Sequence, residues 1–185
     1  METETLIEFE KSLESITSDK QAFHHIARNL IKQNAKSRDS YIDEEDGEQV
    51  LIQNEECAYL GINQSTGETT RCAVGWIILE NIYDPGIEGS PVYDHRVEQC
   101  IAKSTPNWNK TEESLAMLAF AQRVHDSHEV ESWQKILSIA NSRLFWNDGG
   151  SFKLNKIAID TVADDIIKSY KEERYFGTNY PNVEQ

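Results

Sequence analysis

Two cysteines, a histidine and an aspartate are the residues of this sequence whose types could support catalysis. Cys57 and Cys72 flank a segment rich in turn residues, and His125 with Asp126 follows a helical apolar pattern. A cysteine reacts as its thiolate, and an imidazole or a helix N-terminus can lower the pKa of the thiol. One hypothesis is therefore a cysteine-dependent hydrolase or transferase in which Cys72 is the nucleophile and His125 is the base. Asp126 or Asp94 would then orient the imidazole.

The surroundings of Cys72 favour a structural role instead. Ala73 and Val74 follow it directly, and no cysteine-protease motif surrounds it. Free cysteine is among the most buried residue types in folded proteins. The chain has three cysteines, and an odd number indicates free thiols in a reducing compartment rather than a disulfide framework. We therefore expect Cys57 and Cys72 to be apolar fillers of the core.

A metal centre is a second hypothesis. Cys57, Cys72 and His125, together with a carboxylate or Cys100, would supply the four ligands of a zinc ion. The spacing lacks the close C-x₂-C pair that is typical of small zinc sites. The preferred interpretation therefore contains no metal and no cofactor.

The adjacent His125 and Asp126 also resemble the metal-binding doublet of HD phosphohydrolases. That fold needs a further histidine and aspartate from neighbouring helices, and His95 with Asp160 or Asp164 are the candidates. Nothing in their spacing requires such an arrangement. Because a histidine is favourable near a helix C-terminus, we expect His125 to pack at a helix end and Asp126 to cap the next helix.

Two common classes of activity have no support in the sequence. The chain contains no glycine-rich phosphate loop of either common type and no G-x-S-x-G motif. Nucleotide chemistry and serine hydrolysis are therefore not expected.

The chain is strongly acidic, with 18 basic and 32 acidic residues and a formal net charge of −14. Binding to a phosphate backbone requires clustered lysine and arginine, so direct contact with nucleic acid or an anionic membrane is not expected. Such a charge favours a protein partner with a basic surface. We expect residues 38–56 to form a mobile acidic loop that contacts this partner. The expected contact residues are Asp43, Glu44, Glu45, Asp46 and Glu48.

The residue pattern predicts an α+β fold, a mostly helical single domain of residues 1–176 around one small antiparallel hairpin, followed by a tail at 177–185. A length of 185 residues favours one domain. Ser18, Asn109 and Asp126 are the expected N-caps. Apolar residues at three- and four-residue steps predict helices over 3–17, 19–34, 112–125 and 130–144, with short helices after Asp94 and Asp160 and an ambiguous segment at 152–159.

The predicted hairpin pairs residues 58–62 with residues 68–74 across the turn residues 63–67. Asn, Ser and Gly supply the turn conformations, and the neighbouring threonines favour extended chain. A turn centred near residues 64 and 65 would set Cys57 opposite Cys72. A slip of one residue would place the two side chains on opposite faces.

Two sequence phrases are similar to a group of uncharacterised bacterial and phage proteins. One is Cys57-Ala-Tyr59 followed by Cys72-Ala-Val-Gly75, and the other is Gln122-x-x-His125-Asp126 followed by Trp133 and Ile139-Ala140. The chain resembles that group in its C-x-Y…C-A-V-G…H-D…W pattern over roughly residues 22–144. No activity is known for the group, so the resemblance implies only that these residues lie together and that the context is a mobile element.

The leading hypothesis is an acidic, non-enzymatic interaction protein, an accessory or inhibitory factor of phage or mobile-element type that binds a basic protein. The N-terminal residues contain no basic region and no apolar signal core, so the cytoplasm is the expected location. The longest apolar run, residues 72–79, has eight residues, far fewer than the ~18 of a membrane span. The alternatives are the Cys72/His125 enzyme and a small zinc-binding protein.

Overall fold

The computed structural model describes residues 3–45, 48–63, 66–148 and 151–153. This part of the chain contains five α-helices and three two-stranded antiparallel sheets. The predicted α+β, mostly helical single domain around a small antiparallel hairpin is therefore confirmed. The helices are α1 (Thr3–Glu14), α2 (Asp19–Gln33), α3 (His95–Ser104), α4 (Glu112–Ser127) and α5 (Val130–Leu144).

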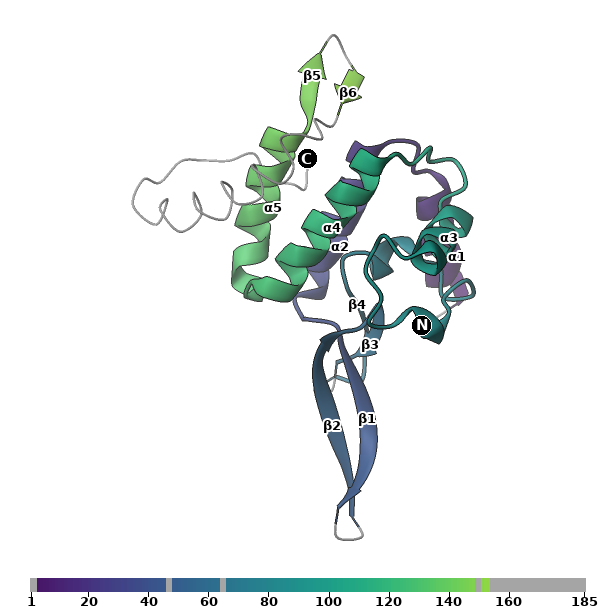
Figure 1. Ribbon diagram of the computed structural model, residues 1–185, viewed down its shortest axis with the longest axis vertical. Coiled ribbons are helices and arrows are strands. Elements are labelled where there is room, and N and C mark those ends of the chain that lie inside the picture. Colours follow the sequence, from purple (N-terminus) through teal and green to yellow (C-terminus); the bar gives the residue numbers. More distant parts are fainter. Residues whose placement is uncertain (1–2, 46–47, 64–65, 149–150, 154–185) are drawn as a thin grey trace, which may run out of the picture.

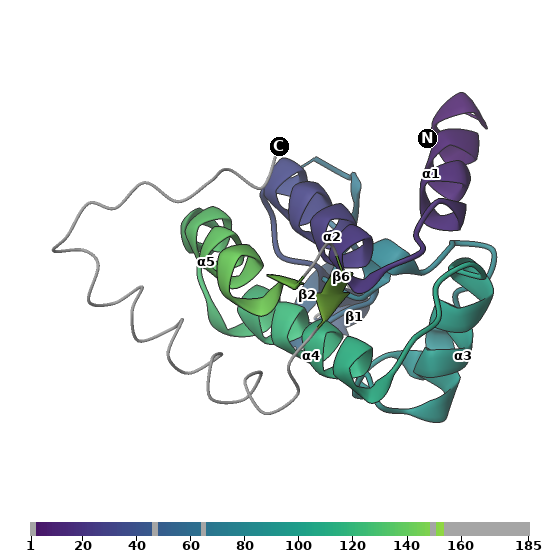
Figure 2. The same ribbon diagram turned by 90° about the horizontal axis from the view of Figure 1, so that it is seen from above.

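Three helices form the centre of the molecule. α2, α4 and α5 pack against one another, while α1 and α3 lie together to one side of them (Figures 1 and 2). α2 buries its apolar stripe completely, including Phe23, Ile26 and Leu30. These residues are three and four positions apart, which is the spacing that places side chains on one face of a helix.

The ends of α2 follow the sequence prediction. The Ser18 hydroxyl accepts a hydrogen bond from the Gln21 N–H at 3.3 Å, which satisfies one of the free donors of the first turn. Asn34 ends the helix with φ = 49°. Asparagine tolerates this left-handed conformation better than most residues because its short polar side chain bonds locally.

The boundaries of α4 and α5 correct two predicted caps. Thr111 rather than Asn109 caps α4, in a reciprocal capping box with Ser114. Asp126 does not cap α5 but lies in the last turn of α4, where its carboxylate binds side chains of the same helix. Glu129 precedes α5 without a side-chain cap.

The central hairpin consists of β3 (Leu60–Ile62) and β4 (Thr69–Arg71). Leu60 pairs with Arg71, so the turn centre lies one residue later than predicted. The ladder ends at this pair, and its register does not set Cys57 opposite Cys72, so that predicted pairing is wrong. The chain after β4 is buried from Cys72 to Val74, and Gly75 is required there because a Cβ atom would lie 2.0 Å from the Tyr59 carbonyl oxygen.

Residues 38–57 form the largest departure from the prediction. They fold into a long antiparallel ribbon, β1 (Arg38–Glu45) and β2 (Glu48–Cys57), where a mobile acidic loop was expected. We call this ribbon the arm and residues 3–37 and 58–145 the body. Figure 1 shows the arm leaving the body as a separate projection. Its strand-forming residues are Tyr41-Ile42 on one side and Val50-Leu51-Ile52 on the other side of Asp46-Gly47, a dipeptide that favours tight hairpins, and Tyr41 pairs with Ile52 and Ile42 with Leu51.

The described part of the C-terminal region is a small hairpin of β5 (Trp146–Asp148) and β6 (Ser151–Lys153). The helix predicted after Asp160, most of the ambiguous segment at 152–159 and the tail at 177–185 lie outside the described residues. None of the helices in the described part of the chain has the length and apolar character needed to cross a lipid bilayer.

Candidate functional site

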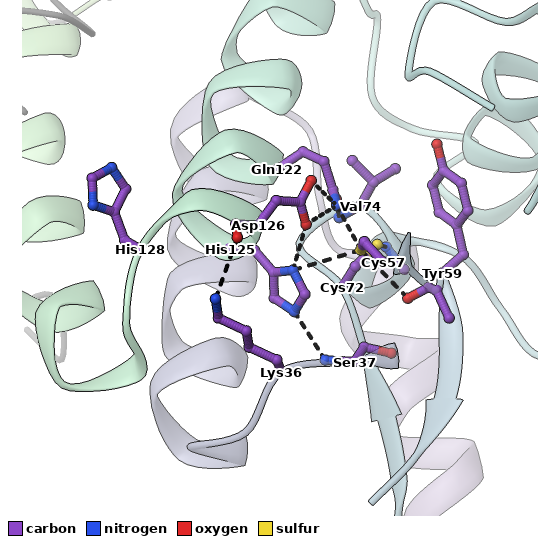
Figure 3. Close-up of polar contacts among 12 residues, drawn as sticks. Lys36, Ser37, Cys57, Tyr59, Cys72, Val74, Gln122, His125, Asp126 and His128 are labelled. Atoms are coloured by element: carbon purple, nitrogen blue, oxygen red, sulfur yellow. Dashed lines mark hydrogen bonds and ion pairs between the residues drawn. The ribbon is translucent and has the colours of Figure 1, made fainter. Parts of the chain in front are cut away.

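His125 is the centre of a polar cluster where the end of α4 meets the base of the arm (Figure 3). Its side chain is buried, with 1% of its surface exposed. The Ser37 N–H donates to Nε2 at 3.1 Å, and Nδ1 lies 2.8 Å from Oδ1 of Asp126. Because Nε2 accepts a hydrogen bond and Asp126 can only accept, these partners assign the ring proton to Nδ1.

One aromatic neighbour packs against the His125 ring. Trp133 of α5 packs against it with ring centroids 5.1 Å apart and an interplanar angle of 31°. The Trp133 indole N–H donates to the carbonyl of His128 at 3.1 Å, so the tryptophan is itself held in place. His128 points away from the cluster (Figure 3).

Cys57, the last residue of β2, supplies the sulfur of the cluster. Its Sγ lies 3.6 Å from Nδ1 of His125 and 2.8 Å from Nε2 of Gln122. The Gln122 amide is oriented because its oxygen accepts the Val74 N–H at 3.3 Å. Its nitrogen therefore faces both Cys57 and the Asp126 carboxylate, to which it donates at 2.9 Å.

Cys72 lies directly behind Cys57, as Figure 3 shows. It is fully buried, and its sulfur accepts the Gly75 N–H at 3.3 Å. The hydrogen bond between the two thiols, together with burial, raises the pKa of Cys57 well above its ordinary value, and His125 offsets only part of this rise. Cys57 is therefore a neutral thiol at neutral pH in the metal-free protein.

The Asp126 carboxylate is the charged member of the cluster. Burial alone would raise its pKa, but hydrogen bonds from His125, Cys57 and Gln122 outweigh burial and hold the pKa of Asp126 below its usual range. The ionised form is favoured because three groups bond to it. Lys36 lies beside it and donates to the backbone carbonyl of Asp126 at 3.3 Å.

The hydrogen bonds differ from those of a catalytic triad. In a triad the nucleophile and the orienting carboxylate bind opposite nitrogens of the imidazole, so that the ring can take a proton on the nucleophile side. Here Cys57 and Asp126 share Nδ1, and the Ser37 N–H occupies Nε2. Cys72, the predicted nucleophile, has no exposed surface. Asp94, the alternative orienting group, caps α3 by accepting the Arg96 N–H.

The same residues are well placed as metal ligands. Cys57 Sγ, His125 Nδ1 and a carboxylate oxygen of Asp126 lie within 4.8 Å of one another, the only such group of His, Cys, Asp and Glu donors among the described residues. Cys100 is not part of it, since its sulfur contacts the Ile82 carbonyl. His95 pairs with Gln99 on the surface of α3. Asp160 and Asp164, the aspartates considered for an HD site, lie outside the described residues.

A small pocket opens beside the cluster. Its volume is about 40 Å³, which is space for a few water molecules or one hydrated ion. Cys57, His125 and Asp126 form one side of it, and Lys36, Ser37 and Arg38 form the other. The three residues whose donor atoms converge therefore border a small space at the base of the arm.

The predicted partner-binding residues lie at the far end of the arm from this cluster. Asp43, Glu44 and Glu45 end β1, Glu48 begins β2, and Asp46 lies outside the described residues. Residues 38–57 contain eight carboxylates and one arginine, which is seven of the fourteen net negative charges of the chain. The acidic charge and the Cys57–His125–Asp126 cluster therefore occupy opposite ends of one element.

Sequence reasoning placed Cys57, Cys72, Gln122, His125 and Asp126 in one region but missed Ser37. Gln122 is three and four residues before His125 and Asp126, the spacing that places side chains on one helical face. That signal was present in the sequence. Ser37 contributes its backbone N–H, which no residue type could have indicated.

Comparison with known proteins gives no relative. No protein family matches the sequence, and no curated protein and no solved structure is significantly similar to it.

Proposed function

We propose that the protein is an acidic, non-enzymatic interaction protein that uses the arm to bind a protein partner with a basic surface. The observation that carries this proposal is the concentration of charge. Seven of the fourteen net negative charges belong to residues 38–57, a ribbon that projects from the body (Figure 1). A charged projection attracts an oppositely charged partner from a distance and accelerates association.

The register of the arm supports a defined contact face. Asp43 pairs with Val50 and Glu45 pairs with Glu48. Because paired residues and alternate residues share a face of an antiparallel ribbon, Asp43, Glu45 and Glu48 belong to the same face near its tip. A basic surface that docks there meets several carboxylates at once.

The isolation of the ribbon also supports docking. Within the described residues, β1 and β2 pair only with each other. A two-stranded ribbon is marginally stable alone, and its outer edges retain unpaired backbone groups. A partner that covers one face or edge therefore stabilises it.

The proposal also includes the class of protein to which this chain belongs. A projecting acidic arm fits an accessory or inhibitory factor of phage or mobile-element type, acting in the cytoplasm. Three free cysteines are consistent with a reducing compartment.

The test compares two triple variants with the same change in net charge, using a fluorescent oligolysine peptide as the basic probe. Asp43→Asn/Glu45→Gln/Glu48→Gln neutralises the arm, and Glu8→Gln/Glu14→Gln/Glu131→Gln neutralises exposed positions of the body. At roughly 0.5 kcal/mol for each exposed charge pair, the arm variant binds about tenfold more weakly. The body variant changes affinity by less than about threefold.

Salt dependence is the second readout of this experiment. Binding to the wild type weakens steeply between about 0.05 and 0.5 M salt, because exposed charges are screened over this range. Equal losses in the two triple variants, or affinity that is independent of salt, would contradict the proposal.

A further inference from the structure

We propose that Cys57, His125 and Asp126 bind one Zn²⁺ ion at the base of the arm, with a water molecule from the adjoining pocket as the fourth ligand. The ligand atoms are Cys57 Sγ, His125 Nδ1 and one carboxylate oxygen of Asp126, which lie within 4.8 Å of one another. A sulfur, an imidazole nitrogen and a carboxylate oxygen are the donor types that Zn²⁺ uses in proteins. This site is independent of the role proposed for the tip of the arm.

The spacing of the donors fits tetrahedral zinc. Bond lengths of about 2.3 Å for sulfur and about 2.05 Å for nitrogen place two tetrahedral ligands about 3.6 Å apart. The distance between Cys57 Sγ and His125 Nδ1 is 3.6 Å. For nitrogen and oxygen the corresponding separation is about 3.3 Å, whereas Nδ1 and Oδ1 of Asp126 lie 2.8 Å apart. The carboxylate therefore moves outward by about half an ångström when the ion replaces the shared proton.

The neighbours of these donors also match a metal site. Ligands of metals are held by hydrogen bonds from a second layer of residues. The Gln122 amide donates to both Cys57 and Asp126, and the Val74 N–H fixes its orientation. Cys72 lies against Cys57 from the buried side (Figure 3).

The charges balance on binding. A Cys57 thiolate and the Asp126 carboxylate together neutralise Zn²⁺ without another anion. Cys57 loses its proton to solvent as the metal–sulfur bond forms, which is the usual coupling between metal binding and thiol ionisation. The pocket opens directly onto all three donors and gives the ion and its water access.

Metal binding would also change the hydrogen bonding of Ser37, the residue directly before the arm. In the metal-free protein, Nδ1 carries the ring proton and Nε2 accepts the Ser37 N–H. The ion takes Nδ1, so the ring proton moves to Nε2. The Ser37 N–H then loses its acceptor and must turn to a new partner. Since β1 begins at Arg38, metal occupancy is coupled to the geometry at the base of the arm.

The experiment titrates the full metal-free chain with Zn²⁺ and, separately, with Co²⁺. We expect about one ion per chain and a near-ultraviolet thiolate–cobalt charge-transfer band. Cys57→Ser and Asp126→Asn remove ligands and bind Zn²⁺ more than about 100-fold more weakly, since loss of a second-layer partner alone costs 10–100-fold. Cys100→Ser is the matched control because its sulfur contacts the Ile82 carbonyl instead, and it binds like the wild type.

Two further variants distinguish the loss of a metal ligand from a loss of the fold. Gln122→Ala keeps all three ligands and binds about tenfold more weakly. Cys72→Ser keeps the stoichiometry and the cobalt band, because water holds the fourth position. A circular dichroism spectrum confirms the fold of each variant. Failure of the wild type to bind either ion, a charge-transfer band that persists in Cys57→Ser, or a loss in Cys72→Ser as large as in Cys57→Ser would overturn the assignment.

Discussion

The body and the arm are stabilised by different kinds of interaction. In the body, the side chains of α2, α4 and α5 fill a continuous core, and many of its large residues have no exposed surface. The arm is a two-stranded ribbon, and at its base Cys57 Sγ accepts from the Gln122 amide at 2.8 Å and lies 3.6 Å from Nδ1 of His125. The body therefore depends on burial and the arm on a few polar contacts.

This difference separates the stability of the molecule from its proposed functions. The residues that dominate the folding free energy lie in the body, whereas half of the net negative charge belongs to the arm and the proposed metal ligands lie at the joint between them. Burial of apolar surface contributes more to stability than exposed polar contacts do. Substitutions in the two regions should therefore differ in size, and the following predictions test that order.

The largest effect is expected for Phe23→Ala in α2. Phe23 is fully buried and its ring packs against Phe145 with centroids 5.3 Å apart. Removing it leaves a cavity, and the free energy of unfolding falls by about 3–5 kcal/mol. Urea denaturation monitored by circular dichroism measures the change. A loss below about 1 kcal/mol would mean that this core is not close-packed.

A pH-dependent effect is expected from His25, also in α2. Burial, more than the nearby Arg28, lowers the pKa of His25 to about 4, although its hydrogen bond to the Trp76 carbonyl works in the opposite direction. The folded protein therefore holds a neutral imidazole, while the unfolded chain titrates near 6.5. The contribution of His25 to stability is complete above pH 6.5. It falls by about 1.4 kcal/mol per pH unit down to pH 4, about 3 kcal/mol in total.

His25→Gln isolates this effect, because glutamine keeps a donor for the Trp76 carbonyl and does not titrate. The free energy of unfolding is measured for both proteins between pH 7 and pH 4. The difference between them should shift in favour of the variant as the pH falls. Parallel curves would show that His25 is not held neutral.

Local signals explain why much of the body could be predicted from the sequence. The Ser18 cap, the apolar stripe of α2 and the Asn34 end each depend on residues within a few positions of one another. The predicted caps of α4 and α5 are wrong. Asn109 and Asp126 are residue types that often cap helices, but other interactions at these positions are stronger. Thr111 forms a capping box, and Asp126 is taken up by His125 and Gln122.

The arm and the joint could be predicted only in part. The acidic side chains of residues 38–56 favour a loop, because Asp and Glu are depleted in strands, and the strand-forming signal is confined to short runs such as residues 50–52. The convergence of Cys57 with His125 depends on how β2 returns to the end of α4. That path follows from the tertiary fold, so only the residue types, and not their pairing, were accessible from the sequence.

An intermediate effect is expected for Arg71→Met in β4. The guanidinium of Arg71 is buried, donates to the carbonyls of Gly75 and Ile78, and lies over the Phe9 ring at 5.2 Å. Methionine keeps apolar bulk but leaves two buried acceptors without this donor, so stability falls by about 2 kcal/mol. Thermal denaturation measures the change.

Glu80→Gln is the matched control for Arg71→Met. Glu80 pairs with Arg71 at 3.2 Å, but about half of its side chain, 49%, is exposed. Exposed partners contribute little, so this variant should lose less than about 1 kcal/mol. Equal losses in the two variants would assign the role of Arg71 to its ion pair rather than to its buried contacts.

The smallest effect on stability is expected from excision of the arm. Arg38 pairs with Cys57 across the ribbon, so an Asn-Gly turn can replace residues 39–56 and retain both ends. The body keeps its core, and shortening the connection lowers its closure entropy slightly. The free energy of unfolding should therefore change by less than about 1 kcal/mol, while binding of the oligolysine probe is lost. A body that unfolds without the arm would show that the two regions are one cooperative unit and that the core alone does not stabilise the fold.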